Sequence, residues 1–176
     1  MSLHIIVDGY NLIRQSNTLS VIENESLEAG RDALVDSLIA YKRLRHHAVT
    51  VVFDGTEADA ILQEPRTRRG GIQILFSHKG QQADTVIKRM ASQERERAVI
   101  VSSDKDIADY AEQQGAAAIG ATAFEEKMKA AILMPTGTMP IDPEAPTEWK
   151  PTTKKKGPSR RRSKRERKRK VRTRKL

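Results

Sequence analysis

The chain has 176 residues, of which 32 are Lys or Arg, 23 are Asp or Glu and none is Cys, and its formal net charge is +9. Residues 154–176 carry 15 basic and one acidic side chain, which leaves 17 basic and 22 acidic side chains in residues 1–153. The lack of cysteine excludes disulfides, zinc–thiolate sites and thiol nucleophiles, and no apolar run approaches the ~20 residues that cross a membrane. We therefore expect a cytoplasmic protein with a mildly acidic body, a strongly basic tail and no membrane partner.

Strand and helix patterns alternate from the start of the chain. Residues 3–7 are a short apolar run rich in branched side chains, typical of a strand buried on both faces. Ser26 can cap a long helix that runs to about Arg45, and residues 48–53 predict a second strand. Residues 72–76 predict a third strand, which follows the turn-forming pair Gly70 and Gly71.

The same alternation continues to residue 134. Residues 83–97 predict a helix, residues 98–101 a fourth strand, a further helix runs to Gln114, and residues 116–119 predict a fifth strand. Thr122 and Glu125 form a capping-box pattern for a last helix to about Leu133. Strands alternating with helices favour right-handed crossovers and a mostly parallel sheet covered on both faces.

The chain changes character after residue 134. Five prolines mark residues 135–153 as an extended linker. The polybasic residues 154–176 cannot bury enough apolar surface to fold alone, so we expect a disordered tail. Its natural partners are polyphosphates such as RNA, ribosomes or DNA, because it lacks the interleaved apolar residues of a membrane anchor.

Acidic side chains stand where the predicted strands end. Asp8 follows the first strand, Asp54 the second, and Asp104 and Asp106 the fourth, while Asp84 opens a helix. The carboxyl ends of parallel strands lie along one edge of a sheet, so these acids should converge there. Carboxylates at close range repel one another, and a divalent cation is the usual way to stabilise them. The pattern predicts a magnesium-dependent phosphodiester enzyme.

Three polar neighbours could support these acids. Asn11 could orient a phosphate or a metal-bound water, and Ser102 and Ser103 could bind a phosphate or fix Asp104. Each acid also has a structural alternative, since an acid near a helix start is often only a cap and Asp54 could belong to a turn.

The segments VDGYN, VVFDG, QADTVIK and VSSDKDI together resemble the NYN domain, a branch of the PIN-like ribonucleases. Within that branch, residues 3–133 look like the small bacterial YacP-type proteins, which include a ribosome-associated endoribonuclease. The resemblance implies a three-layer α/β/α fold with about five strands, Mg²⁺ or Mn²⁺, and cleavage of single-stranded RNA. It places Asp8, Asn11, Asp84 and Asp104 in the metal-binding catalytic site. Asp106 matches an acid of only some branches, and Asp54 could be catalytic, supporting or structural.

Basic and aromatic side chains outside the acid set are candidates for RNA contacts, as phosphate ligands or stacking partners. A solvated charged loop, or packing beneath a loop in the case of Tyr10, is an equal alternative for the members in the body. The set is Tyr10, Arg66, Arg68, Arg69 and Lys79 in the body, and Arg160, Arg161, Arg162, Lys164 and Arg165 in the tail.

The leading hypothesis is a metal-dependent endoribonuclease, with mRNA and the ribosome as expected partners and the tail as an attachment to them. The alternative is a non-catalytic RNA- or ribosome-binding protein that uses the same body and tail. Metal-dependent cleavage would discriminate the two, and the oligomeric state is left open by the sequence.

Overall fold

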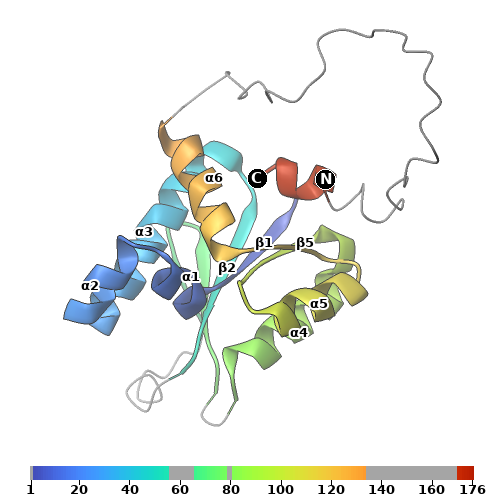
Figure 1. The fold of residues 1–176 in the computed structure, drawn as a ribbon, viewed down its shortest axis with the longest axis horizontal. Helices are drawn as coiled ribbons and strands as arrows, with labels where there is room; N and C mark the ends of the chain where they lie inside the picture. The colour runs from blue at the N-terminus through green and yellow to red at the C-terminus, as the bar shows by residue number, and fades with distance from the viewer. Residues whose placement is uncertain (1, 56–65, 79–80, 134–169) are drawn as a thin grey trace, which may run out of the picture.

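A computed structural model of the protein describes residues 2–55, 66–78, 81–133 and 170–176 (Figure 1). Its centre is a six-stranded sheet in the order β3-β4-β2-β1-β5-β6. Neighbouring strands are parallel except for β3, which is antiparallel to β4. The strands are β1 (His4–Asp8), β2 (Ala48–Phe53), β3 (Arg66–Arg69), β4 (Ile72–Phe76), β5 (Ala98–Val101) and β6 (Ala117–Ile119).

Helices cover both faces of this sheet (Figure 1). On one face, α1, α3 and α6 pack against one another, with α2 against α3; on the other face, α4 packs against α5 and the central strands. The three-layer α/β/α prediction is therefore confirmed. The helices are α1 (Gly9–Gln15), α2 (Leu19–Glu25), α3 (Leu27–Arg45), α4 (Ala83–Glu94), α5 (Lys105–Gln113) and α6 (Ala121–Leu133), with a 3₁₀ turn, η2 (Arg95–Arg97), after α4.

The central strand shows why the chain folds into three layers. Side chains alternate between the faces of a strand, and in β1 Ile5 and Val7 join the core under α3 and α6, whereas Ile6 joins the core under α4 and α5. All three are fully buried. A strand that is apolar on both faces must be covered on both, which the flanking helices accomplish.

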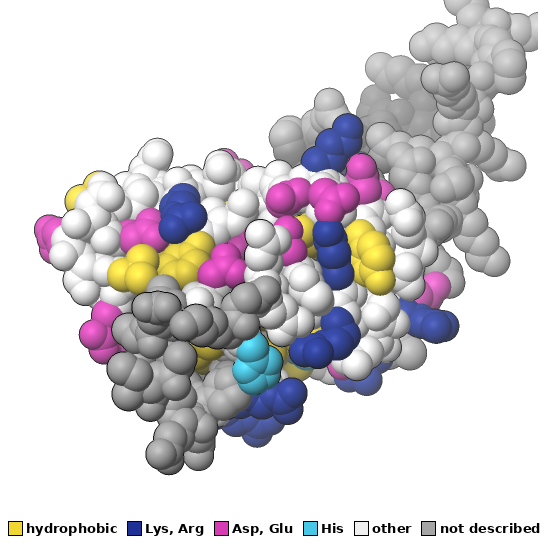
Figure 2. Space-filling view, turned by 90° about the horizontal axis from the view of Figure 1, so that it is seen from below, with side chains coloured by type: hydrophobic (Ala, Val, Ile, Leu, Met, Phe, Trp, Pro, Cys, Tyr) yellow, Lys and Arg dark blue, Asp and Glu magenta, His cyan; other side chains and the backbone are white. Residues whose placement is uncertain are grey.

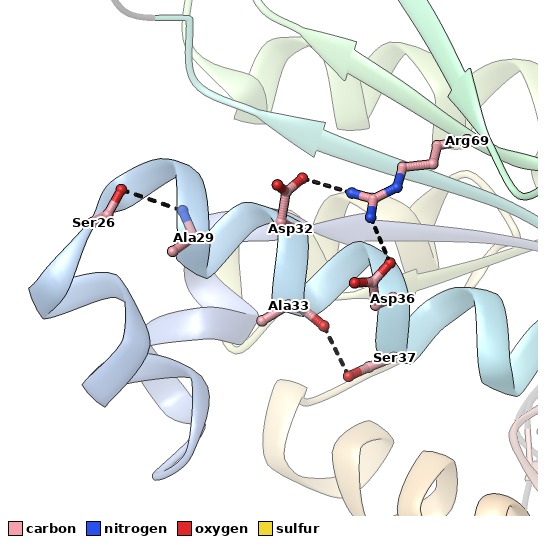
Figure 3. Close-up of polar contacts among 7 residues, drawn as sticks. All are labelled: Ser26, Ala29, Asp32, Ala33, Asp36, Ser37 and Arg69. Atoms are coloured by element: carbon pink, nitrogen blue, oxygen red, sulfur yellow. Dashed lines mark hydrogen bonds and ion pairs between the residues drawn. The ribbon is translucent and has the colours of Figure 1, made fainter.

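Most of the predicted elements are present. The strands expected at residues 48–53, 72–76 and 98–101 have those bounds, and the side chain of Ser26 caps α3 by accepting a hydrogen bond from the amide of Ala29 at 3.4 Å (Figure 3). The prediction of Thr122 as a helix cap is wrong, because α6 begins at Ala121. Glu125 is instead buried and accepts a hydrogen bond from the hydroxyl of Ser16 at 2.6 Å.

The strand β3 was not predicted, because it carries no apolar pattern. All four of its residues are exposed, and it joins β4 through Gly70 and Gly71, whose φ angles of 57° and 81° favour glycine. Arg69 attaches this hairpin to α3, since its guanidinium lies 2.7 Å from a carboxylate oxygen of Asp32 and 2.9 Å from one of Asp36 (Figure 3).

The end of the basic tail is not disordered. Residues 170–174 are helical and lie against the body beside the N-terminus (Figure 1), and Leu176 is only 2% exposed. The predicted linker, residues 135–153, and tail residues 154–169 lie outside the described residues. Within the described ranges, no helix combines the length and the apolar character that a membrane span requires.

Candidate active site

The acidic residues lie at the carboxyl end of the parallel strands, as predicted. Asp8 is the last residue of β1, Asp54 directly follows β2, and Ser102 directly follows β5. The strands β2 and β5 are the two neighbours of β1, so residues up to 94 positions apart in sequence meet here. Figure 2 shows this side of the molecule, with acidic side chains gathered over it and basic side chains between them.

Asp8 is held from two sides. One carboxylate oxygen accepts a hydrogen bond from the amide of Asn11 at 3.3 Å, which caps α1, and the other accepts one from the hydroxyl of Ser102 at 3.0 Å. The helix α1 starts at Gly9 without a linker, and a Cβ there would lie 2.3 Å from the ring of Phe53. Glycine is therefore required for Asp8 to stand at this turn.

One further hydrogen bond joins the loop after β5 to α1, and another lies within that loop. The amide of Ser103 donates to the side-chain oxygen of Asn11 at 2.8 Å, and the amide of Asp104 donates to the hydroxyl of Ser102 at 3.1 Å. Asp104 in turn caps α5 by accepting from the amide of Asp106 at 2.7 Å. The start of α1 and the loop after β5 thus form one hydrogen-bonded junction, in which the side chain of Asn11 holds the backbone of Ser103.

Asp54 has a positioning role. The N-cap residue of α4, Gln82, makes no capping hydrogen bond with its side chain. The carboxylate of Asp54 accepts one from the amide of Ala83 at 2.5 Å instead, and so fixes the first turn of the helix that carries Asp84. Of the three roles left open for Asp54, this geometry favours a supporting one.

The acids act on one another electrostatically. Burial raises the pKa of Asp8 to about 6; hydrogen bonds from Ser102 and Asn11 oppose this shift, and the charges of Asp84 and Asp54 add to it. The pKa of Asp84 is also raised, first by burial and then by Asp104, with Lys88 opposing. Asp8, Asp54, Asp84 and Asp104 thus share one negatively charged region.

Lys88 is a member of this region that the sequence analysis missed. Its ammonium group pairs with a carboxylate oxygen of Asp106, whose side chain is 80% exposed. The pair raises the pKa of Lys88, so this side chain remains cationic. A signal was present in the sequence, because Lys88 lies four residues after Asp84 on α4, and residues at that spacing share a helix face.

The donor set fits a hard divalent cation. It consists of carboxylate and amide oxygens, which Mg²⁺ and Mn²⁺ prefer, and the mutual repulsion of its acids is only partly offset by Lys88. Within the described part of the chain, no three acidic or histidine side chains are grouped closely enough to hold a metal ion together. Magnesium usually keeps several waters and takes one or two carboxylates, so Asp8, Asp84 and Asp104 fit in chemistry and charge.

The structure separates the predicted RNA-contacting residues. Tyr10 is buried, stacks edge-on against Phe53 and accepts a hydrogen bond from the guanidinium of Arg31 at 2.6 Å, so its ring is not presented to a base. Arg69 is paired with α3. Arg66 and Arg68 are exposed on β3, and Arg66 lies opposite Leu75, toward the carboxyl end of β4. Lys79 and the tail residues 160–165 lie outside the described residues.

Known proteins resemble this chain in sequence and in fold. A family model of the YacP-like NYN domain matches residues 5–172. The protein YacP of Bacillus subtilis (strain 168), described as uncharacterized, is 28% identical over 87 residues, which are 49% of this chain and 50% of YacP. The match thus spans about half the length of this curated relative.

Two solved structures have a similar fold. The crystal structure of Rae1 (YacP) from Bacillus subtilis superposes with a TM-score of 0.62 at 24% identity and covers 74% of this chain and 75% of its own. A mutant of Rae1 gives a TM-score of 0.60 at 23% identity, with coverage of 73% and 75%.

Proposed function

Because the chain belongs to the YacP-like NYN family, we propose that it is a metal-dependent endoribonuclease that cleaves single-stranded RNA at its acidic edge. NYN and PIN-like domains generally include nucleases that depend on a divalent metal, so membership of the family supports a nuclease-like function on RNA.

The observation that carries the proposal is the hydrogen-bonded junction between the start of α1 and the loop after β5. Through Ser102 and Asn11 it places Asp8 beside the start of α5, where Asp104 stands. Asp54 places Asp84 at the start of α4 from the neighbouring strand. A structural role for each acid alone would not require a shared electrostatic region.

Each residue has a role in this proposal. Asp8, Asp84 and Asp104 would hold Mg²⁺ or Mn²⁺, directly or through water, and the ion when bound would activate water and neutralise charge on the reacting phosphate. Asn11 and Ser102 keep Asp8 and Asp104 in place. Asp54 does the same for Asp84. Asp106, whose carboxylate pairs with Lys88, would act by holding that cation near the phosphate.

The substrate must approach an edge that repels it. Arg66 and Arg68, exposed on β3, would contact the RNA backbone beside the acids, and the polybasic residues, including 160–165, would attract RNA over longer range. We propose mRNA on the ribosome, in the cytoplasm, as the physiological setting.

The test is a cleavage assay with end-labelled RNA, on and off translating ribosomes, in Mg²⁺, Mn²⁺ or EDTA. We expect internal cuts that need metal and that Asp8→Asn and Asp104→Asn each reduce by at least about 100-fold, since each removes charge and keeps shape. Asp109→Asn is the matched control, because Asp109 is an exposed acid on α5 without an assigned role.

Two outcomes would contradict the proposal. Full activity of both site variants would show that the acidic edge does not cut. RNA or ribosome binding without cleavage under every condition would favour the non-catalytic alternative.

A further inference from the structure

The end of the chain is anchored at the opposite end of the sheet from the acidic edge. Leu176 is buried within the core that also holds Leu3 and Tyr41, and the hydroxyl of Tyr41 donates a hydrogen bond to a backbone oxygen of Leu176 at 3.0 Å. Burial raises the pKa of Tyr41 to about 12, so this hydroxyl keeps its proton at physiological pH. Figure 1 shows the segment beside the N-terminus, where β1 begins.

Two more contacts fix the segment along its length. The guanidinium of Arg172 donates to the carbonyl oxygens of Glu96 at 2.7 Å and Gly115 at 2.9 Å. The ring of His47 lies 3.3 Å from the carbonyl oxygen of Lys175. The segment therefore bridges the chain just before β2, before β5 and before β6.

This bridge brings basic side chains from three parts of the chain together. Ala48 of β2 and Ala98 of β5 both pair with His4, so the two strands start level on either side of β1, roughly 10 Å apart. The end of α3 and the turn η2 precede those starts, and the docked segment lies over them. The seven exposed basic residues, which we name the rear basic surface, are Arg43, Arg45, Arg95, Arg97, Lys170, Arg174 and Lys175.

Few acids offset this charge. Glu94 pairs with His4 at 3.4 Å and with Arg97 at 3.7 Å, and Glu96 lies within the same turn. The rear basic surface thus keeps an excess of positive charge, whereas residues 1–153 as a whole are acidic. Among the described residues, the acidic edge and the rear basic surface lie at opposite ends of one sheet.

We propose that the rear basic surface binds the phosphate backbone of RNA, so that the protein grips RNA at one end of its sheet and cuts at the other. The inference rests on the proposed nuclease function for its second half only. A flat cationic surface that lacks an apolar pocket suits phosphate groups. Cations fixed on a folded scaffold also lose less conformational freedom on binding than cations on a free tail. The exposed side chains of Leu44 and Val171 are too few for a membrane anchor.

The test measures RNA binding apart from cleavage. Fluorescence anisotropy of a labelled single-stranded RNA in EDTA, over a series of salt concentrations, gives the affinity and its salt dependence. Arg43→Gln/Arg45→Gln and Arg174→Gln/Lys175→Gln should each make the slope of log K against log salt shallower by about 1.4, at ~0.7 per phosphate contact. Arg89→Gln/Lys127→Gln removes two charges from α4 and α6 and should leave the slope nearly unchanged.

A second variant tests whether the docked position matters. Leu176→Ser keeps every basic side chain but removes the apolar anchor, and we expect it to weaken RNA binding about as much as Arg174→Gln/Lys175→Gln. Circular dichroism would establish that the body remains folded. Wild-type affinity in Leu176→Ser, or equal slopes for the two tested pairs and the control pair, would overturn the inference.

Cleavage separates this inference from the proposed function. The two charge variants should cut a short RNA at the wild-type rate when RNA is saturating, because the acidic edge is intact. A wild-type protein that binds through the rear basic surface but never cuts would refute the nuclease and leave the surface standing. Cleavage by the wild type together with unchanged RNA binding in every charge variant would support the nuclease and refute the rear basic surface as an RNA-binding site.

Discussion

Asp8 is a carboxylate that the fold buries before any cation is bound. Only 9% of the residue is exposed, and burial is the main reason that its pKa is raised to about 6. In the unfolded chain the carboxyl has its ordinary pKa near 3.8. The folded protein therefore favours the neutral form, so the free energy of unfolding falls as the pH rises from about 4 to about 6 and stays at the lower value above pH 6.

We predict that Asp8→Asn stabilises the metal-free protein at neutral pH. From about pH 4 to pH 6 the unfolded state loses the proton while the folded state keeps it, so wild-type stability falls as the pH rises through this window. At 1.36 kcal/mol per pKa unit, the wild type loses roughly 2–3 kcal/mol, which the variant does not lose. Urea unfolding in EDTA at several pH values between 3.5 and 7.5 measures the difference.

The pH dependence of that difference is the decisive feature. The gain should be largest above pH 6 and vanish below about pH 4. A constant difference across the range, or destabilisation above pH 6, would contradict the burial argument. Added Mg²⁺ should stabilise the wild type at pH 7.5 more than Asp8→Asn, because it binds the charged form.

The sequence predicted which acids lie at the candidate site, but it did not predict the contacts that these and neighbouring side chains make. Asp8, Asp84 and Asp104 stand at strand ends or helix starts, which are local features. The pairing of Lys88 with Asp106 depends on how α4 packs against α5, and the burial of Tyr10 depends on Phe53 and Arg31. Such contacts join residues that no local pattern relates.

Among the secondary-structure elements, the buried ones were the most predictable. β2, β4 and β5 are short apolar runs whose bounds follow from burial. In contrast, no helix was predicted between the first strand and the helix capped by Ser26, where α1 and α2 lie. The exposed arginines of β3 give no strand pattern, because its register comes from pairing with β4.

The helix α4 depends on a cap from another element, and this dependence can be tested. Asp54→Ala removes the acceptor for the amide of Ala83, and we expect a loss of about 1 kcal/mol in the free energy of unfolding. The first turn of α4 should loosen and misplace Asp84, so cleavage should fall by more than stability alone explains.

Asp54→Asn provides the matched control, because it keeps an oxygen acceptor. It should retain most of the stability and of the protection of the α4 amides from hydrogen exchange. If Asp54→Ala and Asp54→Asn behave alike in exchange, the carboxylate acts by its charge rather than as a cap.

On the scale of the whole molecule, the last residue described belongs to the core. Leu176 packs with residues from the beginning of the chain, and the family match ends at residue 172, within the docked segment. The strongly basic composition predicted a disordered tail, but composition cannot show that a single leucine, Leu176, packs in the core.

We predict that Leu176→Ala lowers the free energy of unfolding by about 2 kcal/mol, at the low end of the range for buried leucines because the site is peripheral. Leu133→Ala, at a leucine that is 79% exposed, should change it by less than ~0.5 kcal/mol. Urea unfolding of the two variants beside the wild type measures both values. Equal effects would mean that the docked segment contributes no core packing.

The two outer strands have a consequence for solubility. An open sheet edge exposes unpaired backbone groups onto which another chain can add, and proteins prevent this with short or charged edge strands. Here β6 has only three residues, and β3 carries arginine at three of its four positions. Two copies that met edge to edge along β3 would bring six guanidinium groups together. The arginines that give β3 no apolar strand pattern therefore also oppose aggregation through this edge.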